Sequence, residues 1–125
     1  MNQTVNAMPQ ESLIAVALFA ALRPRGSTSS QPSIEIEDVS RLLFKMKKAG
    51  VPLGDLALRR VPEGYYSEDV EMMLGHYLAA DFATKQSPIT ITDAGMHALQ
   101  LIIEEEKKIN PTLLKEAADA LEITL

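Results

Sequence analysis

The 125-residue sequence contains no cysteine and no tryptophan, and it has only two histidines. The absence of cysteine excludes disulfide scaffolds, thiol nucleophiles and cysteine-based zinc ribbons, and it fits a reducing compartment. The sequence also lacks the G-x-S-x-G, H-E-x-x-H, P-loop and G-x-G-x-x-G motifs. Nucleophilic, zinc-hydrolase and nucleotide chemistry therefore have no starting motif. We expect a protein that is not an enzyme and that uses no cofactor and no metal.

Long hydrophobic runs are also missing. The most apolar stretch, residues 13–22, is ten residues long, whereas a helix needs about 20 apolar residues to span a bilayer. No lysine or arginine precedes the stretch, as would be expected at the start of a secretory signal peptide. We expect these residues to form a buried helix of a cytoplasmic protein that has no membrane partner.

The overall composition is that of a globular protein. Hydrophobic residues make up 46% of the chain and charged residues 23%, proportions that at this length favour one compact domain over two. We expect a single domain over residues 1–125, with a core at 9–109 and a further helix at 110–125. The last helix has enough apolar residues to pack either on its own domain or on a neighbouring molecule.

The first half of the chain is predicted to contain two helices. The first begins near Pro9, is apolar on nearly every side and ends before Pro24, because proline disfavours a helical conformation in the residue before it. A loop over residues 25–33 follows. The second helix covers residues 37–49 and ends at Gly50, a typical helix-terminating residue.

The middle of the chain is less regular. Residues 51–64 contain two prolines and two glycines between apolar residues, which predicts packed irregular chain, with one short helical turn near Asp55. The segment is too apolar for a linker. Ser67 is then a favourable N-cap, and the amphipathic helix that follows it is predicted to reach about Phe82.

The last part of the chain is predicted to contain a strand and two helices. Residues 87–92 alternate apolar and polar side chains and are β-branched, which indicates a short strand. Thr92 can cap a helix that ends near Ile109, and Asn110 and Pro111 are a suitable N-cap and first residue for a last helix. The order of elements predicts a mainly helical, winged-helix-like domain with a short strand or hairpin and a C-terminal helical extension.

Two segments resemble parts of bacterial winged-helix domains. The stretch Val61-Pro-Glu-Gly-Tyr-Tyr-Ser67 precedes an amphipathic helix, and Ile89-Thr-Ile-Thr-Asp-Ala-Gly95 is similar to the Leu-Thr-x-x-Gly exit from their wing. With the helix before them, they resemble the Panacea domain associated with antitoxins over about residues 11–101. Tyr65 stands where the turn of that family has proline. The resemblance implies a small non-enzymatic module that binds another protein or DNA.

Charge is divided unevenly along the chain. Residues 1–62 hold eight Lys and Arg and five acidic residues, a net charge of +3, while residues 63–125 hold four and twelve, a net charge of −8, which together give −5. Such asymmetry is typical of a polar interaction surface. The predicted anion-binding or DNA-binding cluster consists of Arg41, Lys45, Lys48, Arg59 and Arg60. The alternatives are an ordinary exposed face, or pairing with the acidic half of this chain or of a second copy.

The helix that would contact DNA in a winged-helix domain is acidic. Residues 67–82 include Glu68, Asp69, Glu71 and Asp81 and no lysine or arginine. Carboxylates repel the phosphates of DNA and cannot replace the basic and amide side chains that contact base edges. Binding of DNA by this helix is therefore disfavoured. The acids either stabilise the helix N-terminus or bind a basic partner.

Two adjacent tyrosines form the clearest candidate for protein contact. Tyr65 and Tyr66 follow a glycine in a segment expected to be partly exposed, and tyrosine gives a large contact area at a low entropic cost. The predicted protein-interaction residues are Tyr65, Tyr66, Glu68 and Glu71. The alternative is that one ring covers the core above Leu53 or Leu58.

The histidines give weaker indications. Asp93 and His97 lie four residues apart on a predicted helix and could offer an oxygen and a nitrogen to one metal ion, but a capping aspartate with a nearby histidine is the more frequent arrangement. His76 is expected to be a partly exposed helix residue. The run Glu104–Glu106 is expected to face solvent.

These observations lead to two hypotheses. The first is a regulatory module, antitoxin-like or accessory, that acts through protein–protein interaction and that could be a homodimer. The second is a DNA-binding transcriptional regulator that uses the basic cluster.

Overall fold

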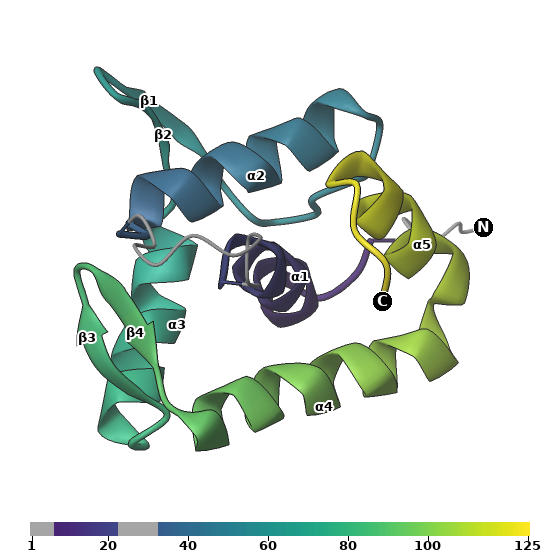
Figure 1. Cartoon of the computed structure of the whole chain (residues 1–125). Coiled ribbons are helices and arrows are strands. Elements are labelled where there is room, and N and C mark those ends of the chain that lie inside the picture. Colours follow the sequence, from purple (N-terminus) through teal and green to yellow (C-terminus); the bar gives the residue numbers. More distant parts are fainter. Residues whose placement is uncertain (1–6, 23–32) are drawn as a thin grey trace.

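The computed structural model describes residues 7–22 and 33–125. These residues form five helices and two antiparallel hairpins (Figure 1), so the predicted class, mainly helical with a short hairpin and a C-terminal helix, is confirmed. The helices are α1 (Gln10–Leu22), α2 (Ile36–Lys48), α3 (Glu68–Ala79), α4 (Asp93–Ile109) and α5 (Pro111–Ala120), and the strands are β1 (Arg59–Val61), β2 (Gly64–Tyr66), β3 (Ala83–Gln86) and β4 (Ile89–Ile91).

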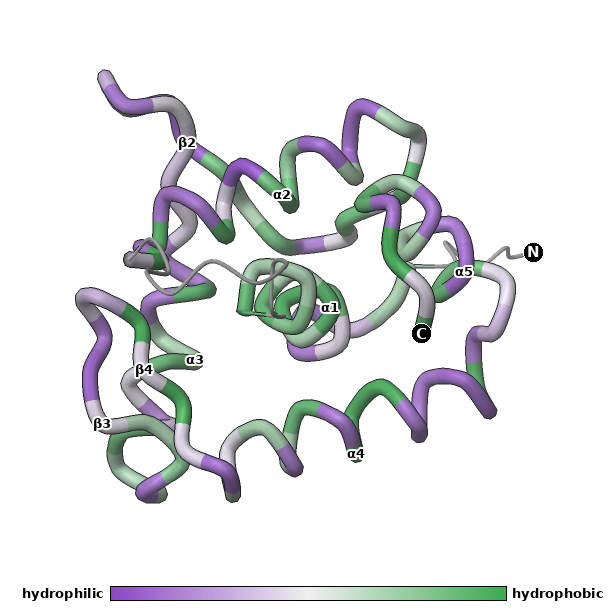
Figure 2. The backbone as a smooth tube through the Cα atoms, in the orientation of Figure 1, coloured by the Kyte–Doolittle hydropathy of each residue, from purple (hydrophilic) through white to green (hydrophobic). Residues whose placement is uncertain are grey.

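Helix α1 lies at the centre of the molecule. Figure 1 shows it end-on with the other four helices around it, and Figure 2 shows that it is hydrophobic along most of its length. Its residues from Ser12 to Leu18 are all buried, which confirms the prediction of a buried helix. Arg23 and Pro24, and all of the predicted loop at 25–33 except Ser33, lie outside the described residues. None of the described helices is long and apolar enough to cross a membrane.

Helix α2 packs on α1 through a buried stripe that includes Val39, Leu43 and Met46. At its start, the backbone N–H of Glu35 donates a hydrogen bond to Oδ2 of Asp38 over 2.8 Å, so an acidic side chain occupies the positive end of the helix. The helix ends before Gly50, as predicted. Gly50 has a φ of +98°, a conformation that glycine adopts at no steric cost.

The first hairpin was not predicted. Residues 51–58 are irregular and packed, as expected, with a hydrogen-bonded turn in which the N–H of Leu56 donates to the carbonyl of Leu53 over 3.1 Å. From Arg59 onward the prediction of irregular chain is wrong, because β1 and β2 pair with Arg60 opposite Tyr65. These three-residue strands have no fully buried side chain and hence no alternation of apolar and polar residues to reveal them.

Helix α3 begins as predicted and ends earlier than predicted. The N–H of Val70 donates to Oγ of Ser67, the N-cap, over 3.3 Å. Asp81 adopts a φ of +64°, and the N–H of Phe82 donates back to the carbonyl of Tyr77 over 2.8 Å. This left-handed residue ends the helical region before Phe82 and directs the chain into β3.

The predicted strand at 87–92 is present as β4 and pairs with β3, which was not predicted separately. The N–H of Ile89 also donates to the carbonyl of Ile34 over 2.7 Å, so the hairpin is joined to the segment that leads into α2. Thr92 caps α4 as predicted, since Oγ1 of Thr92 accepts from the N–H of Gly95 over 3.0 Å. The β3–β4 hairpin is thus fixed at both of its ends.

The last two helices meet at a buried carboxylate. Glu106 was expected to face solvent, but its exposure is 3%. Oγ of Ser12 donates to it over 2.6 Å, and Nδ2 of Asn110 donates to it over 2.5 Å. The expectation of an exposed Glu106 is wrong. Its partner Ser12 lies 94 residues away in the sequence, so the residues next to Glu106 gave no sign of its burial. Asn110 directs its side chain to Glu106 instead of capping α5.

Helix α5 packs on its own chain and not as a free extension. Leu114, Ala117 and Ala118 are buried in the same cluster as the residues of α1 and α2, and so are Leu121 and Ile123 after the helix. Pro111 is its first residue, as predicted. Removing residues 110–125 is therefore expected to expose apolar core surface rather than to release a stable monomer.

Candidate functional surface

One face of α2 carries basic side chains around an aromatic ring. Arg41, Lys45 and Lys48 are exposed, and Phe44, which lies between them, is half-buried. These four residues follow the i, i+3, i+4, i+7 spacing that places side chains on one helix face. The predicted grouping of the three cations is thus found, with Phe44 as an additional member that the sequence interpretation missed.

The β1–β2 hairpin rests on this face through Tyr65. The rings of Phe44 and Tyr65 stack with their centroids 4.0 Å apart and an angle of 16° between their planes. The guanidinium of Arg60, which is paired with Tyr65 across the hairpin, lies 6.0 Å from the centre of the Tyr65 ring. We call the set Arg41, Phe44, Lys45, Lys48, Arg60 and Tyr65 the aromatic–basic surface.

Tyr66 belongs to the opposite face of the hairpin, because successive strand residues point to opposite sides. The guanidinium of Arg59 lies 5.0 Å from the centre of its ring and pairs with Glu68 over 2.7 Å. Tyr66 also packs against the hydrophobic core. Burial raises the pKa of Tyr66 to about 12, and the carboxylate of Glu71 adds to the rise.

The four predicted protein-interaction residues therefore do not form one surface. Tyr65 lies with Phe44, whereas Tyr66 and Glu71 line a shallow groove of about 340 Å³ with Glu35 and Glu37. Glu68 is engaged by Arg59. The adjacent tyrosines look equivalent in the sequence, but the strand alternation gives them different surroundings.

Many of the charges near the hairpin are already paired. Arg41 pairs with Asp38 over 3.2 Å, and Lys45 pairs with Glu122 over 3.7 Å. Arg59 is the third of the five predicted anion-binding residues that has a carboxylate partner. Within the described part of the chain, Lys48 and Arg60 have no carboxylate at ion-pair distance.

The acids of α3 have structural contacts of their own. Besides the pair of Glu68 with Arg59, Oδ2 of Asp69 accepts a hydrogen bond from the N–H of Ala57 over 3.0 Å. Asp81 sits at the left-handed turn after the helix. These contacts agree with the interpretation that the acids stabilise the start of α3 and its surroundings.

The histidines are separated from this surface. Asp93 and His97 are exposed on α4, and His76 is exposed on α3. Across residues 7–22 and 33–125, no three or more His, Asp or Glu side chains are grouped to hold a metal ion.

Comparison of the chain with models of known protein families, with curated proteins and with solved structures finds no match. The resemblance to winged-helix and Panacea domains consequently stays a prediction that rests on the segments 61–67 and 89–95.

Proposed function

We propose that this chain is a small non-enzymatic regulatory module, antitoxin-like or accessory in type, that acts by binding another protein through the aromatic–basic surface. The observation that carries the proposal is the stacked pair of Phe44 and Tyr65 with Arg60 beside it. Neither ring belongs to the hydrophobic core. Aromatic and arginine side chains grouped in this way are typical of the residues that dominate binding energy at protein interfaces.

The free cations indicate the chemistry of the partner. Lys48 and Arg60 lie on this surface without a carboxylate partner among the described residues, so they can pair with acidic groups of another protein. Complementary charge at the rim of an interface increases the association rate and the specificity. The proposed partner therefore presents an acidic, partly apolar surface.

The DNA-binding alternative has weaker support. Three of the five cations that it needs are paired with carboxylates of this chain, and α3 carries several acids and no lysine or arginine. Phosphate contacts by Arg41, Lys45 and Arg59 would compete with these ion pairs. The same surface would still have to carry DNA, so one set of variants can test both hypotheses.

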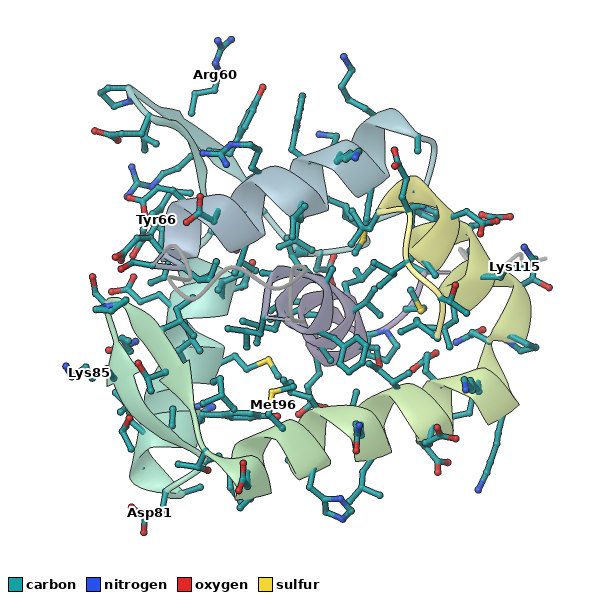
Figure 3. The ribbon with its side chains drawn as sticks, in the orientation of Figure 1. Arg60, Tyr66, Asp81, Lys85, Met96 and Lys115 are labelled. Carbon is teal, nitrogen blue, oxygen red and sulfur yellow. The ribbon has the colours of Figure 1, made fainter. Side chains whose placement is uncertain are left out.

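Site-specific photo-cross-linking tests the proposal. A photoreactive amino acid at position 60 should capture the partner from cells, while the same group at position 115 should not. Arg60 of β1 lies at the upper edge of the molecule, and Lys115 of α5 lies at the right-hand edge, away from it (Figure 3). Binding of the purified captured protein is then measured by calorimetry with Arg60→Glu and with Lys115→Glu as the matched control. Arg60→Glu should lower the affinity about tenfold or more.

Two outcomes would contradict the proposal. Equal affinities for Arg60→Glu and Lys115→Glu would show that the aromatic–basic surface does not bind the captured protein. The second contradicting outcome would come from fluorescence anisotropy with a labelled DNA duplex. Binding tighter than ~100 μM that falls steeply with salt, and that is lost in Arg60→Glu, would assign the surface to DNA.

A further inference from the structure

A second exposed surface lies on α4, away from the β1–β2 hairpin. Three large apolar side chains of the described residues are more than half exposed, namely Met72 at 61%, Leu101 at 56% and Ile109 at 62%. Leu101 stands at the edge of a groove of about 320 Å³, which is also lined by Phe19, Ile103 and Leu125. The other lining residues are polar, namely His97, Gln100, Glu104, Lys107 and Thr124. An exposed apolar side chain ringed by polar ones resembles the centre and rim of a small protein interface.

Among the described residues, no helix or strand covers the outer face of α4. The buried face of this helix includes Leu99, Ile103 and Glu106. On the opposite side His97, Leu101 and Glu105 are exposed. In Figure 1, α4 runs along the lower edge of the molecule with no other described element outside it. At 100° per residue, Ile109 lies about 80° around the helix from Leu101, so it belongs to another side.

We propose that this face binds a second copy of the chain, with the two α4 helices antiparallel and a two-fold axis beside Leu101. A two-fold contact uses the same patch on both molecules. Leu101 satisfies this requirement, because it is both the protruding side chain and a wall of the groove. Each molecule would place its Leu101 beside Leu101 of the other, at the edge of both grooves.

The charges along α4 fit this arrangement. With the axis at Leu101, residues at equal distances before and after it lie opposite each other, so His97 faces Glu105 of the second copy. Lys108 of each chain comes within one helical turn of Asp93 of the other. Asp93 and Lys108 are exposed, and neither forms an ion pair within the described residues.

The arrangement also avoids repulsion. Glu104 and Lys107 fall opposite Ala98 and Gly95 of the second copy, which carry no charge. Antiparallel packing also places the positive end of each helix beside the negative end of the other. A parallel pair would instead place Lys108 beside Lys108 and Asp93 beside Asp93. The antiparallel pair is therefore the arrangement that this helix favours.

The proposed dimer does not depend on the proposed function. The β1–β2 hairpin and α4 lie at opposite edges of the molecule in Figure 1. A dimer formed through α4 therefore leaves the aromatic–basic surface of each copy free. Failure of one proposal would leave the other unaffected.

Sedimentation velocity from micromolar to submillimolar concentration gives the first test. The wild-type chain should reach the mass of a dimer, and Leu101→Glu should remain a monomer with an unchanged circular dichroism spectrum. Met72→Glu is the matched control, because Met72 is equally exposed but lies on α3, and it should dimerise like wild type. A wild-type monomer at every concentration would overturn the proposal, as would a Leu101→Glu protein that is folded and dimeric.

A cysteine cross-link tests the position of the axis. The chain has no cysteine, so Leu101→Cys introduces a single thiol. At a two-fold axis the two Cα atoms come within the roughly 4.4–6.8 Å that a disulfide bridges, and mild oxidation should give a covalent dimer. Met72→Cys under the same conditions should stay largely monomeric. Equal rates of cross-linking in the two variants would rule out the proposed axis.

Discussion

The two hairpins have the same topology and almost the same length, but they are attached to the molecule in different ways. β3–β4 places Ala83 and Ile89 in the core, and backbone hydrogen bonds tie Ile89 to Ile34 and Thr92 to Phe82. In β1–β2 every side chain is exposed or half-buried. Its contact with α2 includes the stacked rings of Phe44 and Tyr65.

This difference indicates two roles. The anchoring residues of β3–β4 are determined by packing, because Ala83 and Ile89 lie in the core and Ile89 also donates a backbone hydrogen bond to Ile34. The outer face of β1–β2 has few such requirements: Arg60 is exposed, and Tyr65 is half-buried where it stacks on Phe44. The end of β2 is nevertheless anchored to α2, because the N–H of Ser67, the residue after β2, donates a hydrogen bond to the buried hydroxyl of Ser40 over 3.0 Å. A fixed base with an exposed outer face suits a binding element.

The largest predicted loss of stability comes from a substitution in the β3–β4 hairpin. Ile89→Ala removes a fully packed side chain and should lower the free energy of unfolding by about 2–5 kcal/mol, as measured by urea denaturation. Val61→Ala is the equivalent change in the exposed hairpin and should lower it by about 1 kcal/mol, because Val61 is only half-buried. Equal losses would mean that the two hairpins contribute alike to the core.

Gly95→Ala should give the next largest effect. A Cβ atom at this position would lie 2.0 Å from the carbonyl oxygen of Phe82 and 2.6 Å from Cγ2 of Ile91. Relieving that overlap should cost about 1–3 kcal/mol and should separate the β3–β4 hairpin from α4.

Gly75→Ala is the matched control for Gly95→Ala. It lies inside α3, where a Cβ atom would meet nothing within 4 Å, so the higher helix propensity of alanine should stabilise the protein by about 0.5–1 kcal/mol. The two substitutions are chemically identical and should differ in sign when both are measured by urea denaturation. A stabilising Gly95→Ala would contradict the close packing of α4 on Phe82.

The exposed hairpin should show a smaller effect on stability and a larger effect on binding. Tyr65→Ala removes the stack on Phe44 and should lower the free energy of unfolding by about 1 kcal/mol, while it weakens the partner complex about tenfold or more. Calorimetric binding and thermal melting of the same variant measure the two quantities. A large fall in the melting temperature with an intact complex would assign Tyr65 to stability and not to recognition.

Local chemistry made the helices predictable from the sequence. Ser67 and Thr92 cap α3 and α4 through hydrogen bonds to residues three positions later, and Pro111 starts α5 in the same local way. Such contacts can be inferred from adjacent letters of the sequence. The first hairpin was missed because its strands are short and charged, and because its turn, with Pro62 and Gly64, was interpreted as irregular chain.

Tertiary contacts set the limit of the prediction for the candidate surface. The cations of α2 could be grouped because helix periodicity alone places them together. The stack of Phe44 on Tyr65 joins residues from two elements, and the burial of Glu106 depends on Ser12 at the other end of the chain. No local pattern carries such information. The clearest available indication was that Phe44 lies outside the apolar stripe of its helix.

An effect that appears only at high pH concerns the inner face of the β1–β2 hairpin. Burial raises the pKa of Tyr66 from 10.0 to about 12, so the folded chain holds this phenolic proton more tightly than the unfolded chain. The stability that results is complete below pH 10 and is lost as the pH rises towards 12. Tyr66→Phe should therefore lose less stability than wild type across this range in urea titrations. Burial also raises the pKa of Tyr77, but Tyr77 is present in both proteins and its effect cancels. Parallel pH profiles for the two proteins would show that Tyr66 is not desolvated and that both faces of the β1–β2 hairpin are equally open to solvent.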